Sequence, residues 1–256
     1  MDKRKMSTLG EIADITKLAG FEFTKHIEYN DLGEIIALRA LNLKGGVLDL
    51  SNVQRISKFI SDKLPRSKLY KGDILFSYTG SVGEVALVDS DDKYHLAPNI
   101  CRLRVIEGVN AKYVYQYLKS STFKRVMRGY IVGSTQMTIP MKNIRQIEIP
   151  IVPLAEQEAI ASVLSALDDK IENNRRMNET LEEMARAIFK SWFVDFDPVH
   201  AKTAGNAPAH MNAETAALFP SSFGDNGLPA GWKASKFEDL IEFKNGYAFK
   251  SKEISK

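Results

Sequence analysis

An apolar heptad pattern between residues 154 and 194 constrains the fold of this chain more than any other feature of its sequence. Its positions recur in steps of four and three residues: Ile160, Leu164, Leu167, Ile171, Asn174, Asn178, Leu181, Ala185, Ile188 and Trp192. A stripe with a period of 3.5 residues stays on one side of a supercoiled helix, where a second helix must cover it. The pattern predicts one long coiled-coil helix, and these residues are its expected pairing interface.

Residues around and within this stripe refine the prediction. Asn174 and Asn178 occupy core positions, where a polar residue fixes register and orientation at some cost in stability. Pro153, with Glu156 and Glu158 in the first turn, marks the start of the helix. The alternative is an amphipathic helix that lies on the core of its own domain. A length of about 60 Å at 1.5 Å per residue favours the coiled coil.

The beginning of the chain is repeated near its end. Leu9, Ile12, Asp14 and Ile15, followed by Gly20–Phe23, match Phe237, Leu240, Glu242 and Phe243, followed by Gly246–Phe249. Each stretch is expected to form a short amphipathic helix and then a Gly-aromatic-x-Phe turn. Unless the similarity is due to chance, a module of roughly 230 residues begins again near Gly231 and Trp232.

The composition is typical of a soluble globular protein. The chain has 256 residues, of which 44% are hydrophobic, enough for one large or two ordinary domains. It lacks both an apolar run of 18 residues and an apolar stretch after Met1, so no membrane contact is predicted and we expect a cytoplasmic location. Cys101 lies in the predicted strand Asn99–Val105 and is expected to be a buried small hydrophobic residue.

Positive charge is concentrated in the first part of the chain. Residues 1–150 contain 23 Lys and Arg against 16 Asp and Glu, although the whole chain carries only +3. Two windows hold much of this charge: Lys58, Lys63, Arg66, Lys68 and Lys71, and then Lys119, Lys124, Arg125 and Arg128. These residues are candidate phosphate contacts, and the alternative is that they form ordinary solvated faces.

Residue periodicity and turn residues predict a mixture of helices and strands before the long helix. The predicted helices are Ser7–Asp14, capped by Ser7 or Thr8, Ala111–Leu118 and Thr122–Gly129. The predicted strands are Glu34–Leu41, a short one after the turn Leu43–Val47, the buried Ile74–Ser77, and Ile147–Pro150. Tyr78–Gly83 is expected to be an exposed turn. The fold class is therefore α+β, with a mixed α/β domain followed by a long coiled-coil helix.

Several segments carry a resemblance to a known family. Pro153–Ala161, Leu167–Asn174, Leu181–Glu182 and Phe189–Phe196 resemble the conserved spacer helix of type I restriction-modification specificity subunits. Upstream, Gly72–Ser77, Gly80–Gly83, Gly133–Gln136 and Ile144–Pro150 are similar to the target recognition domain of that family. Downstream, Asp197–Val199, Leu218–Pro220 and Leu228–Trp232 are similar to its linker.

This resemblance implies a domain plan and a function. The plan is a target recognition domain over 1–152, a spacer helix over 153–195, a linker over 196–230 and the start of a second recognition domain over 231–256. Family members carry two recognition domains held apart by paired antiparallel helices, so the chain is expected to recognise DNA. It ends at Lys256, shortly into the second module. We therefore expect two copies to pair through the spacer helix and to favour an inverted-repeat site.

The residues expected to contact DNA fall into two groups. Phosphate contacts are expected from the basic window, through Lys63, Arg66, Lys68 and Lys71. Base and backbone contacts are expected from one hairpin and two loops, through Arg39, Asn42, Lys44, Tyr78, Thr79, Gly80, Ser81, Gly83, Thr135 and Gln136. Each has a structural alternative: Gly80 and Gly83 are also explained by turn geometry, and Gln136 by capping of a strand.

No catalytic motif stands out. A phosphate-binding GxxxxGK[ST] loop, a HExxH pair and the Pro-Pro-aromatic signature of amino-methylating enzymes are missing from the sequence. Asp91–Lys93 and Asp168–Lys170 superficially match the acidic-x-Lys element of nucleases but lack an evident acidic partner upstream. The four histidines show no metal-ligand spacing and are expected at the surface or in loops: His26, His95, His200 and His210.

The resemblance assigns the chemistry to partners. Methylation subunits would dock on the spacer helix, whose acidic face carries Glu172, Glu179, Glu182 and Glu183, and restriction subunits would join that core. S-adenosylmethionine, Mg²⁺ and ATP would bind these partners and not this chain. Two other classes of function remain open: an independent methyltransferase fragment, and a coiled-coil scaffold without DNA affinity.

Overall fold

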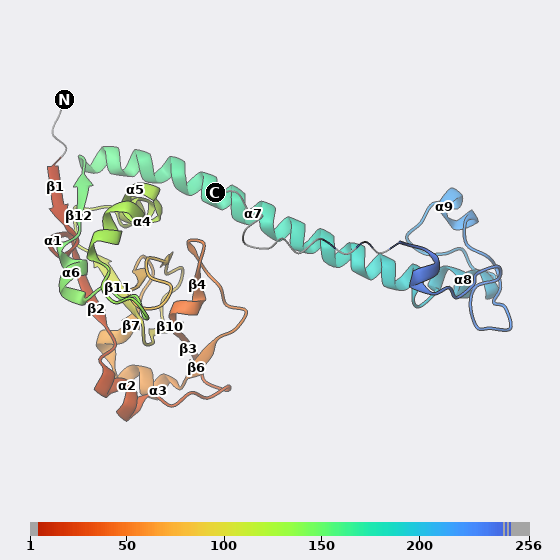
Figure 1. Cartoon of the computed structure of the whole chain (residues 1–256), viewed down its shortest axis with the longest axis horizontal. Coiled ribbons are helices and arrows are strands. Elements are labelled where there is room, and N and C mark those ends of the chain that lie inside the picture. Colours follow the sequence, from red (N-terminus) through yellow and green to blue (C-terminus); the bar gives the residue numbers. More distant parts are fainter. Residues whose placement is uncertain (1–4, 243, 245, 247–256) are drawn as a thin grey trace. The chain divides into compact units, whose positions relative to one another are not determined.

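The computed structural model describes residues 5–242, Lys244 and Gly246, and the chain divides into two compact units, Met1–Ile171 and Glu172–Lys256 (Figure 1). The first unit contains two four-stranded sheets. One has the order β6-β3-β10-β7 and is formed by β3 (Ile35–Leu38), β6 (Gln54–Ile56), β7 (Lys68–Leu69) and β10 (Tyr94–Leu96). In it only the pair β3 and β10 is parallel.

The second sheet is antiparallel throughout and has the order β2-β11-β8-β9. Its strands are β2 (Ala13–Lys17), β8 (Ile74–Ser77), β9 (Val85–Leu87) and β11 (Ile100–Val105). Two small antiparallel pairs complete the strands: β1 (Lys5–Thr8) with β12 (Glu148–Ile151), and β4 (Leu43–Lys44) with β5 (Val47–Leu48). The predicted turn at residues 43–47 and the buried strand at 74–77 are thereby confirmed.

Short helices connect and cover these sheets. They are α1 (Leu9–Ile12), α2 (Gly20–His26), η1 (Ala40–Asn42), α3 (Lys58–Lys63), η2 (Pro65–Ser67), α4 (Ala111–Lys119), α5 (Ser121–Met127), η3 (Arg128–Tyr130) and α6 (Met141–Gln146). Side-chain oxygens of Asn110 and Ser120 accept hydrogen bonds from backbone N–H groups at the starts of α4 and α5. The rings of Phe123 and Phe76 meet edge to face in the main core, which ties α5 to the second sheet.

The predicted long helix is present as α7 (Leu154–Phe193), 40 residues without a break. Its start is fixed where Gln157, which is buried, accepts a hydrogen bond from the backbone of Asn110 and donates one to Val152. Ile160 packs partly on the core of the first unit. Beyond it the heptad stripe is exposed, with Leu167, Ile171, Leu181 and Ile188 at 55%, 61%, 54% and 43%. The alternative of a helix lying on its own domain therefore holds only for its first turns.

The second unit contains the end of α7 and a small aromatic cluster. Two helices follow, α8 (Asp197–Thr203) and α9 (Ala213–Ala217), and a 3-10 turn η4 (Phe237–Asp239) comes later. Rings from three segments form this cluster, and each has its centroid within 6.3 Å of at least one other: Trp192, Phe193, Phe196, Phe219, Phe223 and Trp232. The segment 196–230, expected as a linker, thus has secondary structure and apolar packing of its own.

Several local predictions need correction. Only Leu9–Ile12 of the predicted helix Ser7–Asp14 is helical, because the flanking residues pair as strands β1 and β2. Gly20–Phe23 opens helix α2 and is not a turn. His95 is fully buried in β10, contrary to the surface position expected for it.

The repeated opening has the same local contact in both copies. The backbone N–H of Thr8 donates to Glu11 at 2.8 Å, and that of Lys236 donates to Asp239 at 3.2 Å. Each contact closes the start of a short helical turn. The rest of the second copy, including Phe243 and residues 247–249, lies outside the described residues, as does most of the predicted module start beyond Glu242.

Candidate nucleic-acid interface

The turn that follows β8 and the loop before α6 form one surface. The carbonyl of Tyr78 accepts hydrogen bonds from the backbone of Ile139 at 2.8 Å and from Thr138 Oγ1 at 2.9 Å. Thr79 and Thr138 share a hydrogen bond between their hydroxyls at 2.8 Å, and the N–H of Gly80 donates to the carbonyl of Met137. Two segments that the sequence suggested separately are therefore held side by side.

The β4–β5 hairpin packs next to this turn. The backbone N–H of Gly45 donates to the carboxylate of Glu84 at 3.1 Å, and the hydroxyl of Tyr115 donates to the carbonyl of Gly46. We call three segments together the recognition surface: hairpin residues 43–48, turn residues 78–81 and loop residues 132–138. On it Lys44, Gly80, Ser81, Thr135 and Gln136 are exposed, and Tyr78 and Thr79 are half-buried.

Not all of the predicted contact residues are available to a ligand. Asn42 is completely buried: its oxygen accepts from the Arg39 N–H, and its amide donates to the carbonyls of Asp49 and Asn52. The expected base contact of Asn42 is therefore replaced by a structural role in the hairpin loop. Arg39 is half-buried and bonded to Asn52. The residue types of Asn42 and Arg39 indicated hydrogen-bonding groups correctly, but they did not indicate that these side chains are buried or half-buried.

Gly83 is also structural. It is buried, its φ is +91°, and a Cβ added to it would lie 2.6 Å from the terminal methyl of Met127. The positive φ favours glycine at this position, and the terminal methyl of Met127 occupies the space next to it. Gly80 has a φ of +81° with open space around it, so the turn can approach a ligand closely there.

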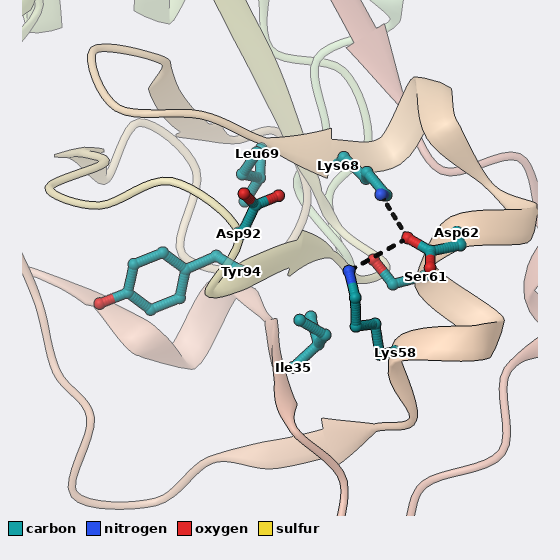
Figure 2. Close-up of a pocket in the computed structure, with 8 residues that line it drawn as sticks. All are labelled: Ile35, Lys58, Ser61, Asp62, Lys68, Leu69, Asp92 and Tyr94. Carbon is teal, nitrogen blue, oxygen red and sulfur yellow. Dashed lines mark hydrogen bonds and ion pairs between the residues drawn. The ribbon is translucent and has the colours of Figure 1, made fainter.

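The first basic window, residues 58–71, belongs to the other sheet. Lys63, Arg66 and Lys71 are exposed, but the ammonium group of Lys68 is paired with Asp62, which Lys58 also approaches at 3.7 Å. Figure 2 shows both lysines directed at this carboxylate in a small pocket. The hydrogen bond that Lys68 donates to the Asp62 carboxylate raises the pKa of Lys68. Asp62 neutralises the charge that Lys68 would offer to a phosphate.

The second basic window divides into two parts. Lys119 is held by Asp168 of α7 at 2.7 Å. Lys124, Arg125 and Arg128 are exposed and form no ion pair with any residue that the structure describes. Met127 packs at Gly83, so the end of α5 lies beside the turn of the recognition surface. The three free cations are thus better placed for phosphate contact than Lys68.

Sequence reasoning missed one cation at this surface. Lys17, exposed at the end of β2, places its ammonium nitrogen 5.2 Å from the centroid of the Tyr78 ring. Lys17 stands alone in the sequence, and only the strand pairing brings it to Tyr78. The same packing buries the phenol of Tyr78, and this burial raises its pKa.

Catalytic and membrane features were searched over the part of the chain that the structure describes. There, no group of three or more His, Cys, Asp or Glu side chains could hold a metal ion. Nor does any described helix have the length and apolar character needed to cross a membrane. Cys101 is buried as expected, and this burial raises its pKa to about 12.

Comparison with known proteins agrees with the fold and with the resemblance. Residues 1–183 match the family described as the type I restriction modification DNA specificity domain. The chain belongs to this family. Its mixed α/β domain followed by a long helix is the predicted fold class, now confirmed.

Individual members of the specificity-domain family give the extent of the similarity. The chain is 31% identical to the type I restriction enzyme MjaIX specificity subunit of Methanocaldococcus jannaschii over 72% of its own length and 39% of the relative's. It is 30% identical to the HindI specificity subunit of Haemophilus influenzae over 79% of its length and 43% of the relative's. The chain therefore spans well under half the length of these curated relatives.

A solved structure has the same fold. The type I restriction-modification S subunit from M. genitalium aligns with a TM-score of 0.52 at 21% identity, covering 80% of this chain and 50% of that one. A second structure, described as showing complex assembly of the type I restriction-modification system, aligns with a TM-score of 0.51 at 19% identity. At these identities the comparison establishes the fold alone.

Proposed function

We propose that this chain is a sequence-specific DNA-recognition subunit of a type I restriction-modification complex. Residues 5–152 would bind one part of the target, and α7 would set the distance to the other part. The chain itself would carry out no catalysis. S-adenosylmethionine, Mg²⁺ and ATP would bind the methylation and restriction subunits that assemble on it.

One observation supports DNA binding above the others: the recognition surface combines exposed loop backbone with hydrogen-bonding side chains, next to cations that form no ion pair with any described residue. Thr135 and Gln136 offer donors and acceptors that suit base edges. Lys17, Arg125 and Arg128 offer charge for phosphates. The chain belongs to the specificity-domain family. In such a domain, this surface suits the binding of duplex DNA better than the binding of a small ligand.

The exposed stripe of α7 supports a helical partner. Leu167, Ile171, Leu181 and Ile188 are each more than two-fifths exposed, and leaving such a stripe in water is unfavourable. For the 256-residue chain on its own, we infer that a second copy covers this stripe through an isologous interface. Such a dimer would present two identical recognition domains and would favour an inverted-repeat site.

Salt dependence of binding to duplex DNA tests the proposed function. We expect the logarithm of the affinity to fall linearly with the logarithm of the salt concentration, because phosphate contacts release counterions. Lys17→Ala and Arg128→Ala should each reduce that slope by about 1, and Lys68→Ala by less, because Lys68 is already paired with Asp62.

The two rival classes give different results. A coiled-coil scaffold without DNA affinity would show no increase in binding as salt falls. An independent methyltransferase would transfer labelled methyl groups to DNA without any other subunit. Either result would contradict the proposed function.

A further inference from the structure

A second asparagine, Asn99, emerges at the recognition surface although no pattern in the sequence marks it. It follows Pro98 in the tight turn between β10 and β11, where its φ is +73°. A type II turn, with proline at its second position, has a left-handed residue at the third, and asparagine tolerates this conformation better than any residue except glycine. The backbone conformation is therefore explained by the turn, but the choice of asparagine over glycine is not.

The strand register places Asn99 beside Tyr78 and Lys17. Ile100, the next residue, lies opposite Ser77 of β8, and Cys101 lies opposite Lys17 of β2. The carbonyl of Asn99 accepts a hydrogen bond from the Tyr78 N–H at 3.0 Å. Tyr78 in turn is bonded to Thr138 and Ile139 of the 132–138 loop. Asn99 is thus hydrogen-bonded directly to the 78–81 turn and, through Tyr78, connected to the 132–138 loop.

The side chain of Asn99 is free to bind a ligand. It is exposed, and its amide makes no hydrogen bond with any described residue. Asn42, by contrast, is buried with its amide fully used. An asparagine amide has one acceptor and a donor pair, which match N6 and N7 of adenine in the major groove.

We propose that Asn99 is a specificity-determining residue that reads one adenine of the target, with Lys17 holding a neighbouring phosphate. This inference rests on the proposed function. Lys17 supplies the charge that positions the duplex, because its ammonium group lies over the Tyr78 ring at the same edge of the sheet. The base contact carries the sequence information, and the phosphate contact does not.

Asn99→Gly is the decisive variant, since glycine keeps the left-handed turn and removes only the amide. Asn99→Asp keeps the shape of the side chain and removes the donor. Asp92→Gly is the matched control: Asp92 is also an exposed residue with a positive φ, +54°, but lies in the turn before β10. Thermal unfolding of all three variants would verify that each is folded.

The experiment uses the full chain with its co-purifying subunits and a pool of duplex DNA with a randomised interior; the retained fragments are sequenced. We expect wild type and Asp92→Gly to enrich the same motif. Asn99→Gly should lose preference at one A·T position by about five- to 150-fold, with the other positions and the salt slope unchanged. Asn99→Asp should lose the adenine at that same position.

Three outcomes would overturn the inference. Asn99→Gly could enrich the complete wild-type motif, Asn99→Asp could keep the adenine, or Asp92→Gly could relax the same position. In each case the proposed function would stand, because the wild-type motif would still be found. If the wild-type chain enriches no motif, the proposed function fails and the role of Asn99 fails with it.

Discussion

Lys119 of α4 donates a hydrogen bond to Asp168 of α7 across 2.7 Å, and this ion pair ties the long helix to the recognition surface. Gln116 donates to the same carboxylate oxygen at 2.6 Å. The methylene carbons of Lys119 also lie against Gly46 of the hairpin, where an added Cβ would come within 2.8 Å of them. The acidic pair at residues 168–169, which superficially matched a nuclease element, therefore has a structural partner at Asp168.

Removal of this carboxylate should weaken the first unit. We expect Asp168→Ala to lower the free energy of unfolding by about 1 kcal/mol, because two hydrogen bonds are lost but both ionic groups are partly exposed. Urea denaturation would measure the change. Asp169→Ala, at the exposed neighbouring position, is the control, and equal effects of the two substitutions would contradict the assigned role of Asp168.

Cys101 should be unreactive in the folded protein. Burial raises its pKa to about 12, so almost no thiolate is present at pH 8, and a reagent cannot reach the sulfur. Labelling by a thiol-reactive chromophore should therefore proceed only as fast as the first unit opens, and denaturant should accelerate it. Rapid stoichiometric labelling in native buffer would show that β11 is accessible.

His95 should make the stability of the first unit dependent on pH. Burial lowers the pKa of His95 below its value of about 6.5 in the unfolded chain. The unfolded state therefore takes up a proton first, and stability that is complete above pH 6.5 is lost as the pH falls below it. Urea denaturation at pH 7.5 and 5.5 should show a smaller difference for His95→Gln than for the wild type.

The matched control for this titration is His26→Gln at the end of α2, where the side chain is only half-buried. Because this variant keeps the buried imidazole of His95, the pH dependence assigned to His95 should remain in it. The other charges that act on His95 are those of Glu22 and Lys68, and both are retained in these variants. An identical pH dependence in the wild type and His95→Gln would refute the assignment.

Self-association should depend on the heptad stripe of α7. We expect Ile171→Lys to convert a dimer of the isolated chain into a monomer, because it places a charge in the middle of the apolar interface. Asn173→Lys adds the same charge to an exposed position outside the stripe and should leave the dimer intact. Light scattering at micromolar concentration would distinguish them. A monomeric wild-type chain would rule out pairing of two copies.

The long helix could be predicted from the sequence because its signal is local and repeated. Each heptad position between Ile160 and Trp192 supports the same period of 3.5 residues. The recognition surface could be predicted only in pieces. Tyr78 and Thr138 are bonded across 60 residues of sequence, and hydrogen bonds between loops leave no periodic signature. Lys17 and Asn99 were missed for the same reason, since strand pairing alone brings them together.

The burial of individual polar side chains also could not be predicted from residue type. Asn42 and His95 are polar residues in segments that looked exposed, yet both are completely buried. Asn42 satisfies all its hydrogen-bonding groups through the backbone of its own loop, and such a contact depends on the loop conformation. Lys68 was correctly assigned to a basic window, but its pairing with Asp62 required the fold of the first sheet.

The central claim is that the recognition surface binds nucleic acid. The most direct test is amide hydrogen exchange of the full chain with and without duplex DNA. We predict slower exchange on DNA addition in residues 43–48, 78–81 and 132–138, and little change in the basic window 58–71. Protection confined to 58–71, or no protection anywhere in residues 5–152, would contradict the account.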